Sequence, residues 1–442
     1  MGTSRATRGR GRVFGALLVV ALVASACGSA ATPSATTARV AAVSTAKVPA
    51  VSPCGPGTAG PSDEIGVTPE AITVGVVADV TGARAGFRSS WEAMQAFAAY
   101  CNSLGGVSGR RLDVRLFDSS VFHHRQAITD SCTSVLAIVG SAAAFDGDGA
   151  SVETDCGIPD IPALVFEPAH ERVPTVVAPL PTPQQLYLVG PLRHFARTAP
   201  AAVRRSAVAY LNVGVTAIRA ARHVEAGKAV GYRFATIAPF PALTSAADYA
   251  RVAQRIVRHR AGYLSVQGTI TDWVGVQKAL AAANYRPKVV DGLPLLYDPS
   301  YPRLAGAAAE GTYVITQTTP FDDAAGVPEL GRYVDWLQRT VPGAEPTASG
   351  VRSWSAGLLF AEAARKASGH LDRTSLLARL RAVHAWDGNG IQVPSDPAAA
   401  RTSTCFAYVR VEGGTFQRAY PARGFACPRD GWLRLRRDFT HL

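Results

Sequence analysis

The sequence lacks the short motifs that mark the common nucleotide-binding and hydrolytic enzymes. Its 442 residues contain no GxxxxGK[ST] phosphate loop, no HExxH zinc motif and no GxSxG nucleophile turn. No GxGxxG follows the first predicted strand, so the glycine pair that lets a backbone approach a pyrophosphate is missing. No CxxC pair or Cys/His spacing suggests zinc. We therefore expect no catalytic residue, no metal and no cofactor.

Long apolar runs are scarce as well. The run over residues 13–26 follows four arginines and is shorter than the roughly 18 residues that a membrane span needs. This layout predicts a secretory signal peptide over residues 1–26. It ends in Ala24-Ser-Ala-Cys27-Gly, which resembles a bacterial lipobox although Ala24 stands where leucine is usual. We expect a lipid on Cys27 and a location on the outer face of the cell membrane, with plain secretion as the alternative.

Cysteine is infrequent, and its number is odd. Of the seven cysteines, lipidation of Cys27 would leave six, which outside the cytoplasm are expected to form disulfides. Six cysteines allow many connectivities, and the sequence does not decide among them. Proximity along the chain favours the pairs Cys405–Cys427, Cys132–Cys156 and Cys54–Cys101.

Acidic residues are fewer than basic ones, and the formal net charge is +12. Four of the positive charges belong to the arginines before the apolar run, and the others are spread along the chain. The densest group, within residues 251–260, alternates with apolar positions and is typical of a solvated helix face. The charge therefore predicts no nucleic-acid partner.

Most of the chain alternates apolar, β-branched runs with Ala-rich helical segments. After residues 28–66, whose small and polar composition predicts a flexible tether, strands are expected at 71–78, 111–118, 135–139 and 161–166, with helices between them. A proline-rich stretch at 179–183 precedes a second series, which starts with a helix from about 185 to 199 and continues with strands at 206–211, 232–237, 262–266, 288–291 and 311–316. Three helices between 330 and 383 and a hairpin at 405–420 follow. Such alternation is typical of parallel α/β sheets.

Small polar residues follow several of these strands, where an open α/β sheet places its ligands. Hydroxyls and helix N-termini at such positions suit a carboxylate or another polar group. The competing interpretation is that Asp79, Ser119 and Thr269 cap the helices that follow them. The candidate ligand-binding residues are Asp79, Thr81, Ser119, Gly140, Ser141, Ala142, Phe166 and Glu167 in the first series, and Asn212, Gln267, Asp291 and Tyr297 in the second.

One set of segments resembles a known family. Ile72-Thr-Val-Gly-Val, Thr81-Gly82, Asn102-Ser-Leu-Gly-Gly-Val-Ser-Gly-Arg110, Val139-Gly140 and Gly157-Ile-Pro159 are similar to the substrate-binding proteins of branched-chain amino acid type ABC transporters. The resemblance implies the periplasmic binding protein type I fold, in which two Rossmann-like (flavodoxin-like) lobes with parallel sheets are joined by a three-crossing hinge. It also implies that residues 140–142 and 165–167 meet a ligand carboxylate and that an acid of the second lobe, matched here to Asp291, holds an ammonium group.

The sequence departs from that family after the first strand of the second lobe. The usual tyrosine-glycine pair is replaced by Asn212-Val-Gly-Val215, which puts an α-amino acid ligand in question. We expect lobe 1 to comprise residues 67–180 and 318–390, and lobe 2 residues 181–317 and 391–442 with a C-terminal β-hairpin.

The predicted function is that of a monomeric solute-binding lipoprotein. It would capture a small polar ligand, an amino acid or a related carboxylate, between its lobes and deliver it to an ABC transporter permease. A sensor subunit of a signalling system on the same fold is the alternative. A secreted enzyme is a weaker one, because no nucleophile with a base is visible.

Overall fold

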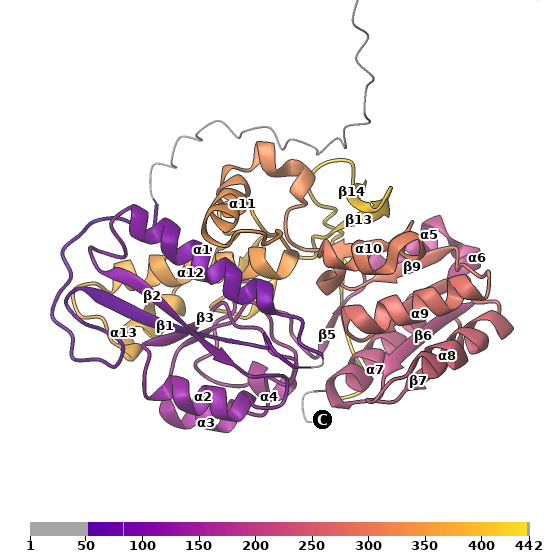
Figure 1. Cartoon of the computed structure of the whole chain (residues 1–442), viewed down its shortest axis with the longest axis horizontal. Coiled ribbons are helices and arrows are strands. Elements are labelled where there is room, and N and C mark those ends of the chain that lie inside the picture. Colours follow the sequence, from indigo (N-terminus) through magenta and orange to yellow (C-terminus); the bar gives the residue numbers. More distant parts are fainter. Residues whose placement is uncertain (1–51, 83, 440–442) are drawn as a thin grey trace, which may run out of the picture. The chain divides into compact units, whose positions relative to one another are not determined.

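The computed structural model describes residues 52–82 and 84–439 (Figure 1). These residues belong to one compact unit. The predicted signal peptide, Cys27 with its predicted lipid, and the tether up to residue 51 lie outside the described residues. Within the described part of the chain, no helix combines the length and apolar character that a bilayer span requires.

The first sheet contains four parallel strands in the order β2-β1-β3-β4. Its central strand β1 is the predicted apolar run, and its residues from Val74 to Ala78 are buried. Helices α1 and α12 cover one face, and α2 and α3 lie on the other (Figure 1). The elements are β1 (Ala71–Ala78), α1 (Arg88–Ser103), β2 (Arg111–Asp118), α2 (His124–Cys132), β3 (Ala137–Val139), α3 (Ala150–Cys156), β4 (Asp160–Ile161) and α4 (Pro168–Glu171).

The second sheet has seven strands in the order β14-β13-β10-β9-β8-β6-β7. The five strands β6 to β10 are parallel, and the C-terminal hairpin β13–β14 adds to β10 in the antiparallel sense. The strands are β6 (Ser206–Leu211), β7 (Phe234–Phe240), β8 (Tyr263–Gln267), β9 (Val289–Gly292), β10 (Tyr313–Thr316), β13 (Ala407–Glu412) and β14 (Thr415–Tyr420).

Two apolar clusters flank this sheet, as the alternation of a strand requires. In β8, Leu264 packs into the cluster on the side of α8 and α9, whereas Tyr263 packs into the cluster on the side of α5 to α7. The helices that follow the strands are α5 (Gly190–Thr198), α6 (Pro200–Val203), α7 (Gly214–Ala229), α8 (Ala246–Arg258), α9 (Ile270–Ala282) and α10 (Ser300–Ala305), with 3₁₀ turns η1 (Pro294–Leu296), η2 (Gly306–Ala309) and η3 (Phe321–Gly326).

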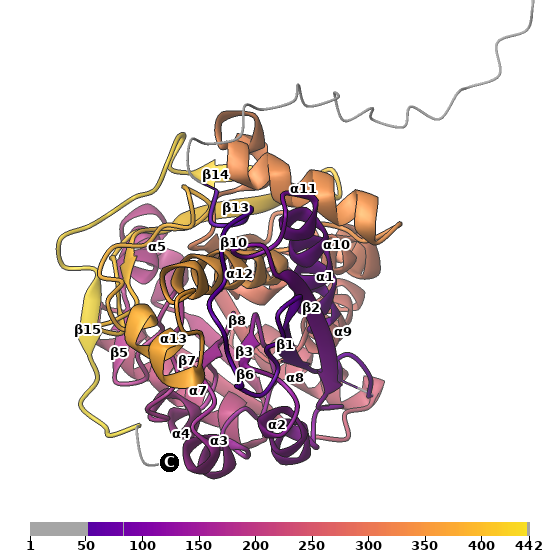
Figure 2. The ribbon, with the colours of Figure 1, turned by 90° about the vertical axis from the view of Figure 1, so that its left-hand side faces the viewer.

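Helices from late in the chain complete the first lobe. Helix α12 (Ala348–Lys366) packs along α1, and α11 (Pro328–Thr340) also contacts α1. Trp354 of α12 is fully buried, with its ring edge against Phe97 at 5.2 Å between ring centroids. Helix α13 (Arg373–Leu380) contacts α12, and the turned view in Figure 2 shows α12 and α13 beside the first sheet. The chain thus passes between the two sheets three times, at 162–185, 317–327 and 381–406.

The predicted helix at 185–199 differs from the structure at its start. Residues Leu186–Leu188 form strand β5, which pairs antiparallel with β15 (Trp432–Arg434), and only then does α5 begin. A partner so distant in sequence leaves no local pattern. A second short pair, β11 (Ser395–Asp396) with β12 (Arg401–Thr402), lies in the third crossing.

The segment Asn102–Arg110 forms a turn at the end of α1. Gly106 has φ +77°, and a Cβ there would lie 1.9 Å from the carbonyl oxygen of Arg110, so only glycine fits. The Asn102 side chain bonds both backbone groups of Leu112, and the Arg110 guanidinium donates to the carbonyls of Thr68 and Gly60. This segment is therefore a structural joint between α1 and β2.

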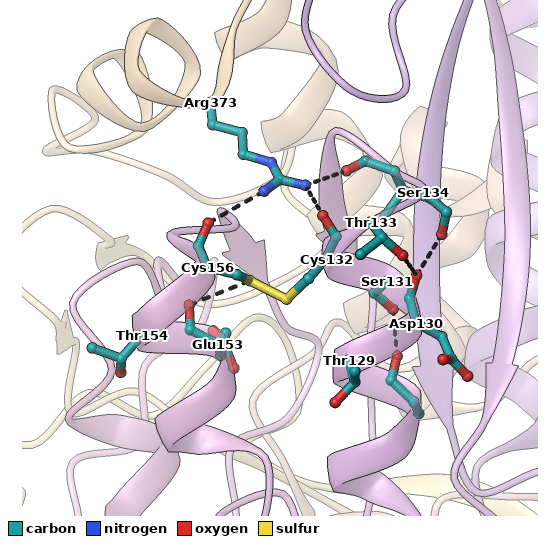
Figure 3. Close-up of a disulfide and its surroundings, with 12 residues drawn as sticks. Thr129, Asp130, Ser131, Cys132, Thr133, Ser134, Glu153, Thr154, Cys156 and Arg373 are labelled. Carbon is teal, nitrogen blue, oxygen red and sulfur yellow. Dashed lines mark hydrogen bonds between the residues drawn. A yellow bond between two sulfur atoms is a disulfide. The ribbon is translucent and has the colours of Figure 1, made fainter.

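The three disulfides have the connectivity that chain proximity favoured: Cys54–Cys101, Cys132–Cys156 and Cys405–Cys427. Figure 3 shows Cys132–Cys156 joining the ends of α2 and α3, with Arg373 of α13 donating hydrogen bonds to the carbonyls of both cysteines. Cys54–Cys101, together with the bond from the Gly60 N–H to the Ser368 carbonyl, holds residues of the predicted tether against the first lobe. Cys54 and Gly60 of the predicted tether are thus attached to the first lobe, and the part before residue 52 lies outside the described residues.

Candidate functional site

Two neighbouring cavities lie between the sheets. The larger, of about 450 Å³, is lined by the loop after β1, the start of α1, the starts of α7 and α9, and residues 295–304 and 343–347; we call it the cleft cavity. The smaller, of about 210 Å³, is lined by residues 164–166, by the crossing at 182–184, by β5, α7 and α12, and by Trp432; we call it the hinge cavity. Both therefore have walls from both lobes.

Phe166, Arg219 and Leu295 line both cavities. The guanidinium carbon of Arg219, on α7, lies 5.3 Å from the centroid of the Phe166 ring. On the side of the cleft cavity, Phe87 packs against Phe166 at 5.4 Å between ring centroids. An aromatic ring and a cation thus form the boundary between the two spaces.

Three arginines and no acid line the hinge cavity. Arg222 donates to the Gln184 side chain at 2.6 Å and to the carbonyls of Pro183 and Leu186. Arg352, on α12, is only 4% exposed and has neither a hydrogen-bond partner nor an ion-pair partner among the described residues. Burial, together with the nearby charge of Arg219, lowers the pKa of Arg352 to about 10.

The cleft cavity has mixed charge. Arg84, in the loop after β1, reaches the second lobe, where its Nη1 lies 2.8 Å from Asp272 Oδ1. Asp272 also closes the capping box of α9 with Thr269, so the interpretation of Thr269 as a helix cap is confirmed. Burial raises the pKa of Glu92, and Asp298 raises it further while Arg88 opposes them.

Most of the predicted residues after β1 and β2 hold the loops together. Asp79 is fully buried and accepts bonds from the Ser119 hydroxyl at 2.6 Å and from the N–H groups of Val121 and Ala144. Thr81 donates to Asp118 at 2.6 Å. Helices α1 and α2 have no side-chain cap, so Asp79 and Ser119 do not cap the helices that follow them.

The predicted loop after β3 is also turned inward. Gly140 has φ +75°, and a Cβ there would meet the Met94 side chain at 2.7 Å. The Ser141 hydroxyl accepts a bond from the Val77 N–H at 2.9 Å and is buried, and Ala142 bridges to Ala78. Of this loop, Ala144 reaches the cleft cavity.

The remaining predicted residues are spread over the second lobe and the end of the first. Glu167 accepts a bond from the Gly147 N–H at 2.9 Å, Asn212 is exposed, and Gln267 donates to Ser265. The Tyr297 hydroxyl accepts a bond from the Phe321 N–H. Of the twelve predicted residues, Phe166 lines the cleft and hinge cavities, and ligand contact by the others stays a prediction.

Asp291 lies in a separate small cavity of about 50 Å³ next to the hinge cavity. It accepts hydrogen bonds from the hydroxyls of Tyr263 at 2.6 Å and Tyr408 at 3.0 Å. Burial raises its pKa to about 6, and the two tyrosine bonds limit that rise. Both carboxylate oxygens are thus already used within the protein.

The reasoning from sequence missed the arginines. Arg352 stands between Val351 and Trp354 in a helix whose residues from 348 to 361 are all buried, and a charge inside such an apolar segment was the signal that could have found it. Arg219 and Arg222 share a face of α7, three residues apart. They resembled the many solvated arginines of this chain, so only the three-dimensional structure distinguishes them.

One buried cluster outside the cavities has metal-ligating side chains. Glu153, Asp160 and His170 bring their ligand atoms within 4.8 Å of one another. Both ring nitrogens of His170 are occupied, at 3.0 Å from Asp146 and 2.9 Å from Asp160, and these carboxylates raise its pKa well above the ordinary value although burial opposes them. Burial raises the pKa of Glu153 to about 8. Carboxylates thus engage both nitrogens of His170, whereas both oxygens of Glu153 and one of Asp160 are buried without a hydrogen-bond partner among the described residues.

Comparison with known proteins identifies the family. The model of the family described as periplasmic binding protein matches residues 71–415, which is more than half of the chain. The chain belongs to the periplasmic binding protein family. The resemblance of its sequence segments is thereby confirmed, and this binding protein has the type I fold that was expected. No curated protein sequence matches it.

Solved structures share the fold at low sequence identity. The fatty acid ABC transporter substrate-binding protein of Thermomonospora curvata is 16% identical, with a TM-score of 0.70 over 83% of this chain and 95% of that one. The branched-chain amino acid binding protein LivJ of Streptococcus pneumoniae, in complex with isoleucine, is 14% identical, with a TM-score of 0.69 over 81% and 100%. A solute-binding protein of Rhodopseudomonas palustris, in complex with 4-hydroxybenzoate, is 18% identical, with a TM-score of 0.65 over 79% and 96%.

Proposed function

We propose that this binding protein captures a small organic ligand between its two lobes and delivers it to an ABC-type permease in the membrane. The observation that carries the proposal is the pair of cavities whose walls come from both lobes. The family supports binding rather than catalysis. The descriptions of three similar structures name isoleucine, 4-hydroxybenzoate and fatty acid as compounds. Each of these compounds has a carboxylate and an apolar part, and we extend that ligand class to this chain.

The mechanism would be a shift of population between lobe arrangements. A ligand shifts the equilibrium between the open and closed arrangements only by the difference in its binding free energy for the two arrangements. A molecule that touches Phe166 of the first lobe and Thr216 and Thr269 of the second at the same time loses contacts when the lobes separate. Such a ligand therefore favours closure, and the closed form is what a permease would recognise.

We also propose that Cys27 carries a lipid that anchors the protein outside the cytoplasm. The arginines and the apolar run before that cysteine support this. Mass spectrometry of the protein from a membrane fraction should show a diacylglyceryl modification at Cys27, and Cys27→Ser should release the protein into the medium. An unmodified, soluble wild-type protein would refute the anchor and leave the binding function open.

The binding function is tested with folded protein that has not been exposed to denaturant. Native mass spectrometry should detect a released small molecule, or a thermal-shift screen of organic acids, amino acids and sugars should raise Tm with at least one of them. Small-angle scattering should then show a smaller radius of gyration with that compound. If no compound is carried, none raises Tm and none changes the scattering, the proposed function is wrong.

A further inference from the structure

The hinge cavity contains two arginines that have neither a hydrogen bond nor an ion pair with the described residues. Arg352 is 4% exposed, and Arg219 is half-buried. Neither makes a hydrogen bond or an ion pair with any described residue, although Arg219 lies over the Phe166 ring. Burial lowers the pKa of both arginines, and for Arg219 the charges of Tyr187 and Asp146 oppose that shift. Ionised side chains are rarely buried without a hydrogen bond or an ion pair, because removing the charge from water costs free energy. The cavity is therefore built to receive a group of opposite charge.

Arg222, in the same wall, differs from these two arginines because it forms hydrogen bonds within the protein. Its guanidinium donates to Gln184, Pro183 and Leu186, all in the first crossing and the strand after it. These bonds tie α7 to that crossing through both terminal nitrogens of Arg222, and its Nε is buried without a hydrogen-bond partner. The free donors of this cavity are thus on α7 of the second lobe and α12 of the first, so that an anion between them would touch both lobes.

The rest of the cavity wall is mainly apolar. Aliphatic and aromatic side chains face the space, and the few other polar residues are neutral. Its apolar and aromatic members include Leu164, Leu186, Tyr187, Leu293, Ile315 and Trp432. Such a wall favours a hydrocarbon or aromatic body attached to the anionic group.

An ammonium group finds no counter-charge there, because none of the described residues that line the hinge cavity is acidic. Asp291 lies in the adjoining small cavity with both oxygens bonded to tyrosine hydroxyls. Asp146, whose charge acts on Arg219, is bonded to His170 and to two backbone N–H groups. In the cleft cavity, Glu345 is paired with Arg303, and Glu92 is near Arg88 and Asp298. An α-amino group beside the arginines would place a third positive charge next to Arg219 and Arg352.

We propose that Arg352 and Arg219 bind the anionic head of an organic acid that has an apolar body and no ammonium group. The proposal rests on the proposed function and names its ligand class. The acid would lie with its head between α12 and α7 and its body against Phe166 and the apolar wall. The ligand class thus includes aromatic and branched aliphatic carboxylates and excludes the amino acids of the same skeleton.

Two matched series of compounds test the class by calorimetry on the full-length protein. The first is 3-phenylpropanoate, L-phenylalanine and 3-phenylpropanamide, and the second is 4-methylpentanoate, L-leucine and 4-methylpentanamide. We expect a carboxylate to bind at least about tenfold more tightly than its amino acid and its amide, because a charge-assisted bond to a buried guanidinium is lost or opposed in the other two. Equal or tighter binding of the amino acid, or of the amide, would overturn the proposal.

Variants test the residues. Arg352→Gln should weaken binding of the preferred carboxylate about tenfold to a hundredfold and should raise the Tm of the ligand-free protein, because a buried unpaired charge is removed. Arg365→Gln, at an exposed position on the same helix α12, is the control and should leave affinity unchanged. A carboxylate that binds Arg352→Gln as well as wild type would refute the site.

The Tm of ligand-free Arg352→Gln is a second test, which does not depend on whether the compounds in the two series bind well. A lower Tm for Arg352→Gln, with loss of the folded state, would mean that Arg352 stabilises the fold, and it would refute the proposal. Binding of a sugar, an amine or an amino acid in the absence of any bound organic acid would refute the ligand class while the proposed function stands. Absence of every ligand would contradict the proposed function itself.

Discussion

Replacing Arg84 with alanine should shift the balance between lobe arrangements. Arg84 Nη1 lies 2.8 Å and 2.9 Å from the two oxygens of Asp272, and its Nη2 donates to the Ala242 carbonyl at 2.7 Å and to the Thr244 hydroxyl at 3.1 Å. All these partners belong to the second lobe, whereas Arg84 belongs to the loop after β1. The contacts therefore exist only while the two lobes are close together.

The size of the effect follows from burial and from the remaining partners. The Arg84 side chain is 22% exposed and that of Asp272 is 0% exposed, so the pair is screened less than a surface ion pair. Asp272 keeps its bonds from Tyr249 and Thr269 when Arg84 is removed, so it is not left fully unsatisfied. We therefore expect a loss of about 1 to 3 kcal/mol, which is about five- to 150-fold in the ratio of closed to open forms.

The assay is the distance distribution between spin labels on exposed sites of the two lobes, measured without ligand and with it. Arg84→Ala should broaden or lengthen the ligand-free distribution and weaken ligand affinity by a similar factor, because the ligand must then supply the lost contact energy. Arg339→Ala removes an exposed ion pair with Asp335 within helix α11 and serves as the control. Unchanged distances and unchanged affinity in Arg84→Ala would refute the role of this contact.

Three further changes have defined expectations. Burial raises the pKa of Glu153 from its ordinary value near 4.5 to about 8, so between these values the folded protein keeps a proton that the unfolded chain has lost. The free energy of unfolding should therefore fall as pH rises from about 4.5 to 8, by up to about 1.4 kcal/mol per pH unit. Glu153→Gln should flatten that decline in urea titrations, and an equally steep slope in the variant would count against the assignment. Trp354→Ala removes a fully buried ring and leaves Glu329 without the indole N–H that donates to it at 2.8 Å. The free energy of unfolding should therefore fall by about 3 to 5 kcal/mol. A loss below about 1 kcal/mol would contradict this and show that the core relaxes around the gap. Replacing both Cys132 and Cys156 with alanine removes a disulfide between residues 24 positions apart. This should lower the free energy of unfolding by about 3 kcal/mol, because the unfolded chain gains conformational entropy. Urea titration should show a lower midpoint, and an unchanged midpoint would contradict the prediction.

Local patterns predicted the α/β elements well because their causes are local. The apolar run of β1, the Ala-rich α1 and the glycines that end it act within a few residues of one another, and each was expected where it is found. Proximity also gave the three disulfides, since two of them close short loops. Strand β5 was not predicted, because its partner among the described strands is β15, more than 240 residues further along the chain.

The site was harder to predict because polar residues at strand ends have two uses. Asp79, Ser119 and Ser141 do follow strands of a parallel sheet, but their hydrogen bonds go to the backbone and to each other, so they shape the loops. Arg352 and Arg219 come from helices of different lobes, more than a hundred residues apart in sequence. They line one cavity only because the three crossings bring α7 and α12 together, and the spacing of residues in the sequence does not predict that arrangement.

The pairing of β15 with β5 affects when and how the cavity can be completed. Trp432 of β15 forms part of the wall of the hinge cavity, next to Leu188 of β5. While the chain is being synthesised, that wall stays incomplete until residue 432 has been added, although both sheets can already have formed. The wall of the hinge cavity is therefore complete only after β15 has paired with β5. A C-terminal fusion partner or a deletion that disturbs residues 432–434 should alter ligand binding without altering the folding of either sheet.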